Sequence, residues 1–115
     1  MIEKTLFDYL SEQLAPTPVF MEKPSPLPDV FVLIEKTGAS RTNRIESARF
    51  AFQSYDETLY KTAELNERVK EAVDSIIELD EIGSAHFETD YPFTDISNKR
   101  YRYQSVYNFT FYKEA

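Results

Sequence analysis

The stretch that decides the fold runs from Ser54 to Gly83, SYDETLYKTAELNERVKEAVDSIIELDEIG. Its apolar side chains recur at the i, i+4, i+7 and i+8 spacing that lines one face of an α-helix. They are Leu65, Val69, Ala72, Val73 and Ile76. The opposite face is mainly acidic and includes Glu64, Glu67, Glu71 and Asp74. The stretch therefore predicts one long amphipathic helix that needs a sheet to cover its apolar face.

Both ends of this helix carry competing signals. Ser54 with Glu57 forms a possible capping box and Asp56 is an alternative N-cap, so we expect the first turn between Ser54 and Leu59. Gly83 can adopt the left-handed conformation that ends helices. A helix of about 20 to 25 residues, roughly 30 to 37 Å long, is expected.

Apolar runs on both sides of this helix predict the remaining elements. Residues 3–14 favour a second amphipathic helix, and a proline-rich connection with a short edge strand at residues 19–21 follows. The other expected strands are residues 30–35, 45–53, 84–91 and 101–113. This order predicts a single α+β domain over residues 1–115: a mainly antiparallel sheet of four to five strands with two helices packed on one face.

Composition excludes several classes of protein. The chain has 115 residues, 42% of them hydrophobic, and no cysteine, so disulfides, a thiolate nucleophile and a cysteine-based zinc site are excluded and a reducing cytoplasm is the expected compartment. No apolar run approaches 18 residues and the first ten residues lack the order of a signal peptide. Neither membrane insertion nor export is therefore expected.

The formal charge of −7 is concentrated in the predicted long helix. Between Asp56 and Glu81 there are nine acidic and three basic residues. Affinity for nucleic acid depends largely on Lys and Arg that displace counterions. The chain is therefore a poor candidate for gripping DNA, although DNA can pass close to it.

No residue pattern indicates catalysis. His86, Glu88 and Asp90 alternate along a predicted strand, so one face could hold a divalent metal, but the only histidine in the chain favours an exposed polar strand instead. The acidic residues of the long helix lie opposite its apolar face and are expected to be solvated. A phosphate-binding glycine loop and a G-x-S-x-G motif are both absent from the sequence. We expect a non-enzymatic protein without metal or cofactor.

The segment KTGASRTNR, residues 36–44, is the first candidate for a contact with another molecule. It contains three basic residues in an acidic chain and nothing apolar larger than alanine, which predicts a long polar hairpin loop. A mobile loop is one interpretation, and a contact with an acidic partner or neighbouring subunit is the other. The candidate contact residues here are Lys36, Gly38, Arg41, Asn43 and Arg44.

The last predicted strand is the second candidate. Alternation places Tyr101, Tyr103, Tyr107, Phe109 and Phe111 on one face and Val106, Thr110 and Tyr112 on the other. Such side chains are often core and cross-strand pairs. Bulky groups on both faces nevertheless suggest that another subunit covers one of them, so Tyr101, Tyr103 and Tyr107 are candidate subunit contacts.

In its order of elements the chain resembles the small tail-terminator and tail-completion proteins of long-tailed bacteriophages, which join head and tail. The matching pieces are IEKTLFDYLSEQL (2–14), LPDVFVLIE (27–35), ARFAFQSYDE (48–57), LYKTAELNERVKEAV (59–73) and YRYQSVYNFTFYK (101–113). The resemblance covers nearly the whole chain and depends on the order and length of these pieces.

The resemblance implies a ring, typically of six subunits, on the head-proximal end of a finished tail tube. Such a ring stops tail growth and presents a surface to the head connector. The implied partners are further copies of the chain, the major tail tube protein and the head connector or stopper protein, and DNA passes through without specific binding. The implied location is the virion tail, after assembly in the host cytoplasm.

Two alternatives stay open. One is another head–tail connector, a stopper or a minor virion protein with the same architecture. The other, from a different class, is a cytoplasmic module that binds a protein or peptide through the hairpin or the aromatic face. An enzyme that uses His86 is the least favoured interpretation.

Overall fold

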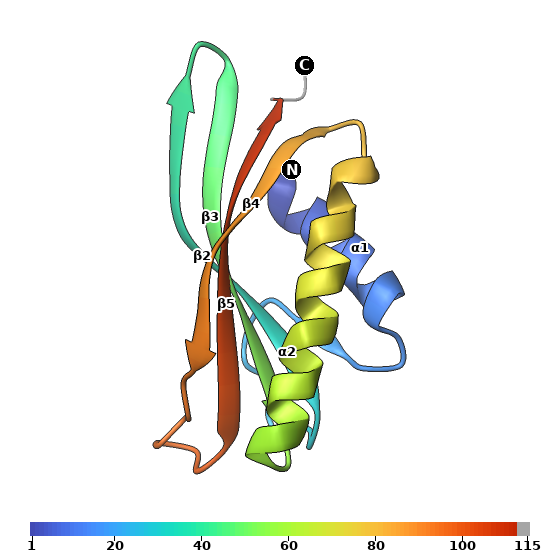
Figure 1. Cartoon of the computed structure of the whole chain (residues 1–115), viewed down its shortest axis with the longest axis vertical. Helices are drawn as coiled ribbons and strands as arrows, with labels where there is room; N and C mark the ends of the chain where they lie inside the picture. The colour runs from blue at the N-terminus through green and yellow to red at the C-terminus, as the bar shows by residue number, and fades with distance from the viewer. Residues whose placement is uncertain (113–115) are drawn as a thin grey trace.

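A five-stranded sheet with both helices on one side forms the molecule, as a computed structural model that describes residues 1–112 shows (Figure 1). The elements in chain order are α1 (Ile2–Leu14), β1 (Val19–Phe20), β2 (Phe31–Thr42), β3 (Ile45–Asp56), α2 (Leu59–Asp74), the 3₁₀-helix η1 (Ser75–Glu78), β4 (Ile82–Pro92) and β5 (Tyr101–Tyr112). The strand order is β1-β2-β3-β5-β4. Only β1 and β2 run parallel. The predicted α+β fold is confirmed, and the sheet is mixed.

The start of α2 differs from the prediction. The N-cap is Thr58, whose Oγ1 accepts a hydrogen bond of 3.1 Å from the backbone N–H of Lys61. Ser54 and Asp56, the predicted capping residues, lie inside β3. Pairing of this part of β3 with β5 extends the strand beyond the point where the local capping signals would have begun the helix.

The end of α2 differs as well. The helix has 16 residues, fewer than expected, because its last turn tightens into η1. Gly83 does not end it and instead lies in β4, at a register shift between Ile82 and Ser84. A Cβ at position 83 would approach Thr110 Oγ1 to 3.1 Å, so this glycine permits close packing of two strands.

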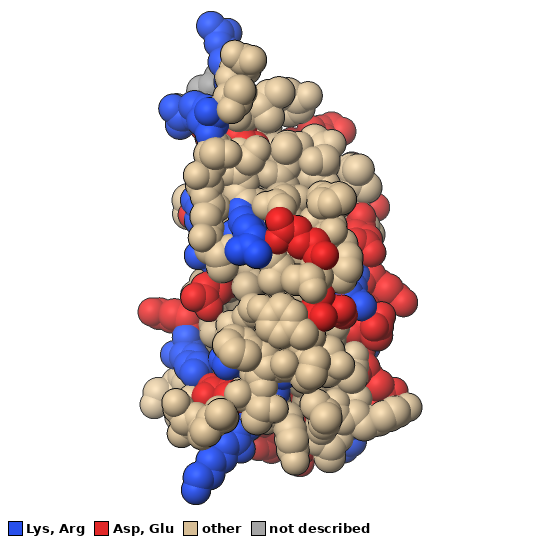
Figure 2. All heavy atoms as spheres, turned by 60° about the vertical axis from the view of Figure 1, so that its left-hand side comes forward, with Lys and Arg blue, Asp and Glu red and all other residues tan. Residues whose placement is uncertain are grey.

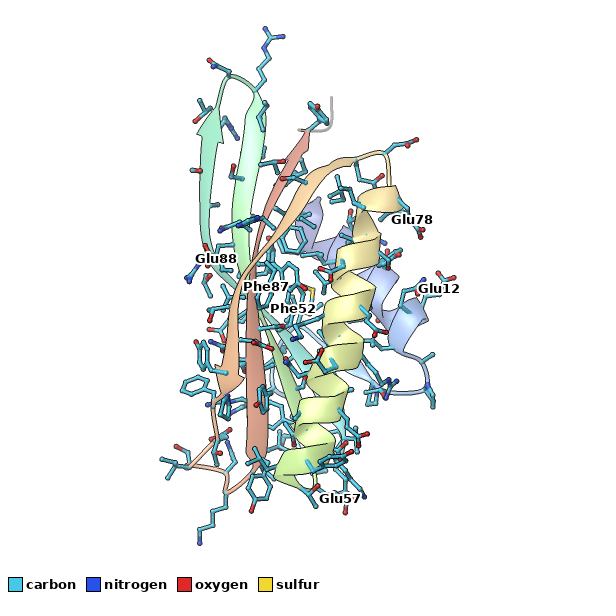
Figure 3. The ribbon with its side chains drawn as sticks, viewed as in Figure 1. Glu12, Phe52, Glu57, Glu78, Phe87 and Glu88 are labelled. Carbon is cyan, nitrogen blue, oxygen red and sulfur yellow. The ribbon has the colours of Figure 1, made fainter. Side chains whose placement is uncertain are left out.

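The core lies between the sheet and the two helices. Every fourth residue of α1 is buried, and the apolar stripe of α2 packs into a cluster whose strand aromatics come from β3 and β5. Figure 3 shows Phe52 and Phe87 pointing into this layer. Edge-to-face pairs join Phe52 to Tyr107 and to Phe109, with ring centroids 5.9 and 6.1 Å apart. The apolar stripes of both predicted helices therefore pack into the same core.

A long β-hairpin replaces the predicted loop at residues 36–44. β2 continues to Thr42 and β3 begins at Ile45, so the turn consists of Asn43 and Arg44 alone. Their φ angles of 50° and 68° are the positive pair that a tight two-residue hairpin requires. The prediction was wrong because polar residues form strands readily when the backbone ladder is satisfied and both faces are solvated. The hairpin projects beyond the rest of the sheet (Figure 1).

Candidate interaction surfaces

The face of the sheet opposite the helices is covered by no helix in the described chain (Figure 1). We call it the open face. A row of hydrogen bonds crosses it from β2 to β4. Gln53 Nε2 donates to Glu35 Oε2 (3.3 Å) and to Gln104 Oε1 (2.8 Å), and Gln104 Nε2 donates to the Tyr91 hydroxyl (2.6 Å). These polar groups satisfy one another, so they form an ordered surface.

A second row crosses the open face nearer the hairpin. Arg49 Nε donates to Glu88 Oε2 at 2.7 Å, and Asn108 also donates to Glu88. The hydrogen bond from Arg49 holds the pKa of the Glu88 carboxyl below its usual value. Figure 2 shows uncharged side chains over most of this side of the molecule, with charged groups in a band across the middle.

Both edges of the sheet offer unpaired backbone. β4 pairs only with β5, and among residues 1–112 β1 covers β2 only at Val32 and Leu33. Bulges interrupt both edges, at residues 36–38 of β2 and at residues 82–84 and 87–89 of β4. Bulges discourage indiscriminate pairing of strands, so an intended neighbour must match their shape.

The five candidate residues of the hairpin are all exposed. Lys36 Nζ lies 3.6 Å from Glu3 of α1, and Arg41 Nε lies 2.7 Å from Glu46 across the hairpin. Arg44 and Asn43 form the tip, and within the described chain Arg44 has no ion pair. Gly38 lies beside a bulge in open space. Of the three basic residues, Arg44 is thus the one left for an external partner.

The three candidate tyrosines of β5 lie in different environments. Tyr101 is 45% exposed and Tyr103 is half-buried. Tyr107 is completely buried, and its hydroxyl donates to Asp74 Oδ1 at 2.8 Å. Burial raises the pKa of Tyr107, and the hydrogen bond to Asp74 raises it further. Tyr107 is therefore a core residue, and its prediction as a subunit contact was wrong because α2 covers it.

The predicted grouping of His86, Glu88 and Asp90 on one strand face is also wrong. A bulge between Phe87 and Thr89 changes which side chains face α2, so Glu88 contacts Arg49 on the open face (Figure 3) while Asp90 contacts α2. Asp90 Oδ2 accepts hydrogen bonds from α2, from Asn66 Nδ2 (2.8 Å) and Lys70 Nζ (2.7 Å). In residues 1–112 no group of three or more His, Cys, Asp or Glu side chains is placed to hold a metal ion.

The buried carboxylate of Asp95, in the turn between β4 and β5, is a feature that the sequence did not reveal. Asp95 is buried there and accepts hydrogen bonds from Lys23 Nζ (2.8 Å), the Tyr55 hydroxyl (3.2 Å) and Asn98 Nδ2 (2.9 Å). Burial alone would raise the pKa of Asp95, but its hydrogen bonds from Lys23 and Asn98 outweigh that effect and hold the pKa well below the usual range. The spacing Asp-x-x-Asn was the available signal. The adjacent Ile96 is 85% exposed.

A hollow of about 490 Å³ lies at the other end of the molecule, beside the base of the hairpin. Its apolar wall consists of Ile2 from α1, Ala39 from β2, Ile82 from β4 and Phe111 from β5. The ion pairs Lys36–Glu3 and Arg41–Glu46, together with Glu81, supply charged groups around it. The hollow is within the size range of roughly 300–1,000 Å³ that is common for binding pockets.

The described residues 1–112 define a small α+β protein with one sheet face that no helix covers and unpaired backbone along both edge strands of the sheet. No family model matches the chain, and comparison with curated proteins gives no match either. No helix in residues 1–112 has both the length and the apolar character that a membrane span requires. The function must therefore be inferred from the surfaces themselves.

Proposed function

We propose that this protein is a non-enzymatic structural component of a long-tailed bacteriophage. In this role it forms a ring at the head-proximal end of the tail tube, stops tail growth and joins the tail to the head. Its partners are further copies of itself, typically six in a ring, the major tail tube protein and the head connector or stopper protein. It acts in the virion after assembly in the host cytoplasm.

The observation that carries this proposal is the unpaired backbone at the two edges of the sheet. A closed ring of identical subunits needs two different surfaces that fit each other. The sheet has β4 as one unpaired edge and residues 34–42 of β2 as the other. These edges differ in sequence and in bulge position. Tyr101 and Tyr112, at the two ends of β5, also remain exposed.

The charge distribution suits passage of DNA through such a ring. The formal charge is −7, and the exposed face of α2 carries Glu64, Glu67, Glu71 and Asp74. Repulsion between carboxylates and phosphates prevents the contacts that would retain the duplex. DNA therefore passes without specific binding.

Electron microscopy of purified protein mixed with tail tubes tests the proposal. We expect rings at one end of each tube and tubes that no longer elongate when tail tube protein is added. A bare tube end that continues to elongate at saturating protein would refute the assigned role.

The hairpin tip supplies a sharper version of the same test. The variant R41E/R44E reverses both charges near the tip and is expected to reduce docking to the tube or to a neighbour. The control K61E/R68E changes the net charge equally, at exposed positions on α2. Normal docking of R41E/R44E would remove the hairpin from the proposed interface. Both variants must first show wild-type circular dichroism.

The free edge of β4 favours a second candidate, a module that takes up an extended peptide as an added strand. A stopper or a minor virion protein with the same layers is the closer variant of the first proposal. If the protein is a peptide-binding module, it should stay monomeric, should not bind tail tubes and should bind peptides from a display library. The ring predicts the opposite behaviour in each assay.

A further inference from the structure

The turn between β4 and β5 carries a highly exposed apolar side chain, Ile96, at an end of the molecule. Ile96 is 85% exposed, the largest exposure among the bulky apolar residues, and it lies at the apex of residues 93–100. Isolated exposed apolar residues are common on protein surfaces. What distinguishes Ile96 is the rigidity of the turn that carries it.

Four sets of contacts fix this turn. Asp95 and Arg100 exchange backbone hydrogen bonds of 2.8 and 3.0 Å across it. The buried carboxylate of Asp95 accepts hydrogen bonds from Lys23 Nζ and from the Tyr55 hydroxyl. It also accepts one from the backbone N–H of Asn98, at 3.2 Å. Arg100 then donates to two backbone carbonyl groups of the preceding proline-rich connection. A side chain displayed on so fixed a turn loses little conformational freedom on binding, as binding anchors require.

The hollow beside the hairpin has the complementary shape. It is concave, it is walled by Ile2, Ala39, Ile82 and Phe111, and its volume of about 490 Å³ exceeds that of one isoleucine side chain. β4 runs from the hollow at Ile82 to the turn after Pro92, so the two features lie at opposite ends of an 11-residue strand. They are therefore separated by roughly 35 Å and cannot meet within one chain.

Charges beside the two features are also complementary. Lys99 follows Ile96 in the turn, is exposed and has no ion pair among the described residues. Glu81 lines the hollow, is exposed and likewise has no ion pair among residues 1–112. The other two carboxylates of the hollow, Glu3 and Glu46, already face cations of their own chain. One free cation thus accompanies the protruding side chain, and one free carboxylate accompanies the hollow.

We propose that Ile96 of one copy inserts into the hollow of the next copy and that Lys99 of the first pairs with Glu81 of the second. A contact between opposite ends of a subunit is heterologous, and repeated contacts of this kind close into a ring or continue as a filament. The inference deepens the proposed function, because it rests on self-assembly and adds a contact between the ends of neighbouring subunits to the sheet edges named there.

Cross-linking in this naturally cysteine-free chain tests the contact directly. A chain carrying I96C and a differently tagged chain carrying A39C are mixed and treated with a short bis-maleimide, alone and in the presence of tail tubes. The expected product is a mixed dimer at a yield at least about fivefold above that of the control pair I77C and A39C. Ile77 is a suitable control because it is 58% exposed and lies in η1, outside the hollow.

A charge exchange tests the register of the same contact. Sedimentation or light scattering is expected to show that I96S, K99E and E81K each weaken association by about tenfold or more, whereas I77S leaves it unchanged. The double variant K99E/E81K restores the lost pair with reversed polarity, so its association should recover. Recovery in the double variant cannot come from unfolding, which would add to the loss.

The outcomes separate this contact from the proposed function. A yield for I96C with A39C no higher than for the control pair, or cross-linking of Ile96 to the tail tube protein instead, overturns the contact even if rings still cap the tubes. Specific cross-linking in a protein that never caps a tube supports the contact and defeats the tail-terminating role.

Discussion

Asp95 is the side chain on which the β4–β5 turn depends. Its carboxylate is almost completely buried yet accepts hydrogen bonds from Lys23, Tyr55 and Asn98. Arg102 lies farther away, at 3.9 Å, and stacks over Tyr55 with 5.7 Å between the guanidinium and the ring centroid. The turn is therefore held by one buried anion among donors from three separate segments.

Replacing Asp95 should destabilise the protein in a pH-dependent manner. We expect D95A to lower the free energy of unfolding at pH 7 by about 2–3 kcal/mol, because hydrogen bonds to a charged acceptor are lost. The folded-state pKa of Asp95 is depressed, so its contribution is complete above the unfolded value of about 4 and is lost as the pH falls below it. Urea denaturation at pH 7, 5 and 3 measures the difference between wild type and variant.

The control for this experiment is D80A, at an exposed aspartate in the connection between η1 and β4. Its free energy of unfolding should stay within about 0.5 kcal/mol of the wild-type value. A D95A effect that is the same at pH 3 as at pH 7 would contradict the electrostatic explanation and leave only a packing effect.

Tyr107 and Tyr101 provide a second pair that separates core from surface. Y107F removes the hydrogen bond to Asp74 and should cost about 1 kcal/mol, while Y107A should cost about 3–5 kcal/mol through the cavity it leaves. Y101A, at an exposed position, should change the free energy of unfolding by less than about 0.5 kcal/mol. Thermal or urea unfolding of the three variants measures these values, and equal losses in Y107A and Y101A would be inconsistent with the burial of Tyr107.

Among the elements, the β2–β3 hairpin combines exposure with local strain. Arg44 has a φ of 68° at the turn, a conformation that glycine adopts without cost and other residues adopt at a cost. Its guanidinium has no partner within the described chain. An exposed arginine in this strained conformation is consistent with a contact between Arg44 and another molecule.

We therefore expect R44G to stabilise the hairpin by about 1 kcal/mol while weakening the contact that Arg44 makes with its partner. Chemical denaturation and the tail-docking assay measure the two effects separately. N43A serves as the comparison, because alanine tolerates positive φ poorly and should destabilise the same turn. A less stable R44G protein would show that Arg44 is held by interactions within the subunit.

The helices were predictable because each carries a single apolar stripe. Leu6, Leu10 and Leu14 of α1 are buried as their spacing required, and so are Leu65 and Val69 of α2. The strands at residues 30–35 and 45–53 were also located correctly but were drawn too short. Their extensions are polar or belong to a segment with helix-capping signals, and cross-strand pairing decides such residues in a way that no local pattern reveals.

The surfaces were less predictable than the fold. The hairpin was identified as exposed, but its strand character was missed. Tyr107 was assigned to a surface because alternation reports which residues share a face and cannot report which face a helix covers. A turn at Asp95 was predictable, but the hydrogen bonds that Asp95 accepts were not, because its donors Lys23 and Tyr55 lie 72 and 40 residues away in the sequence. Contacts over such separations leave no periodic trace.

Considered as one body, the protein places its acidic charge on α2 and basic groups at both ends of its long axis (Figure 2). The formal charge of −7 predicts that the wild-type protein leaves duplex DNA unshifted in a gel at about 50 mM salt. The variant E64K/E71K would place two new cations beside Lys61 and Arg68 at helical spacing. We expect this variant to bind DNA and to release it as salt rises.

The matched control is E64Q/E71Q, which removes the same carboxylates without adding cations and should not bind DNA. Binding by the wild-type protein at physiological salt would contradict free passage of DNA through a ring.

The bulge between Phe87 and Thr89 has a further consequence for how this strand is compared with others. Because of this inserted residue, the part of β4 between its two bulges directs odd-numbered side chains, such as Ala85, toward α2, while the part after the second bulge directs the even-numbered Asp90 there. A relative whose strand lacks the insertion would be out of phase with one of these halves. Aligning the two requires a one-position gap within the strand, and a gapless alignment would equate inward-facing residues with solvated ones.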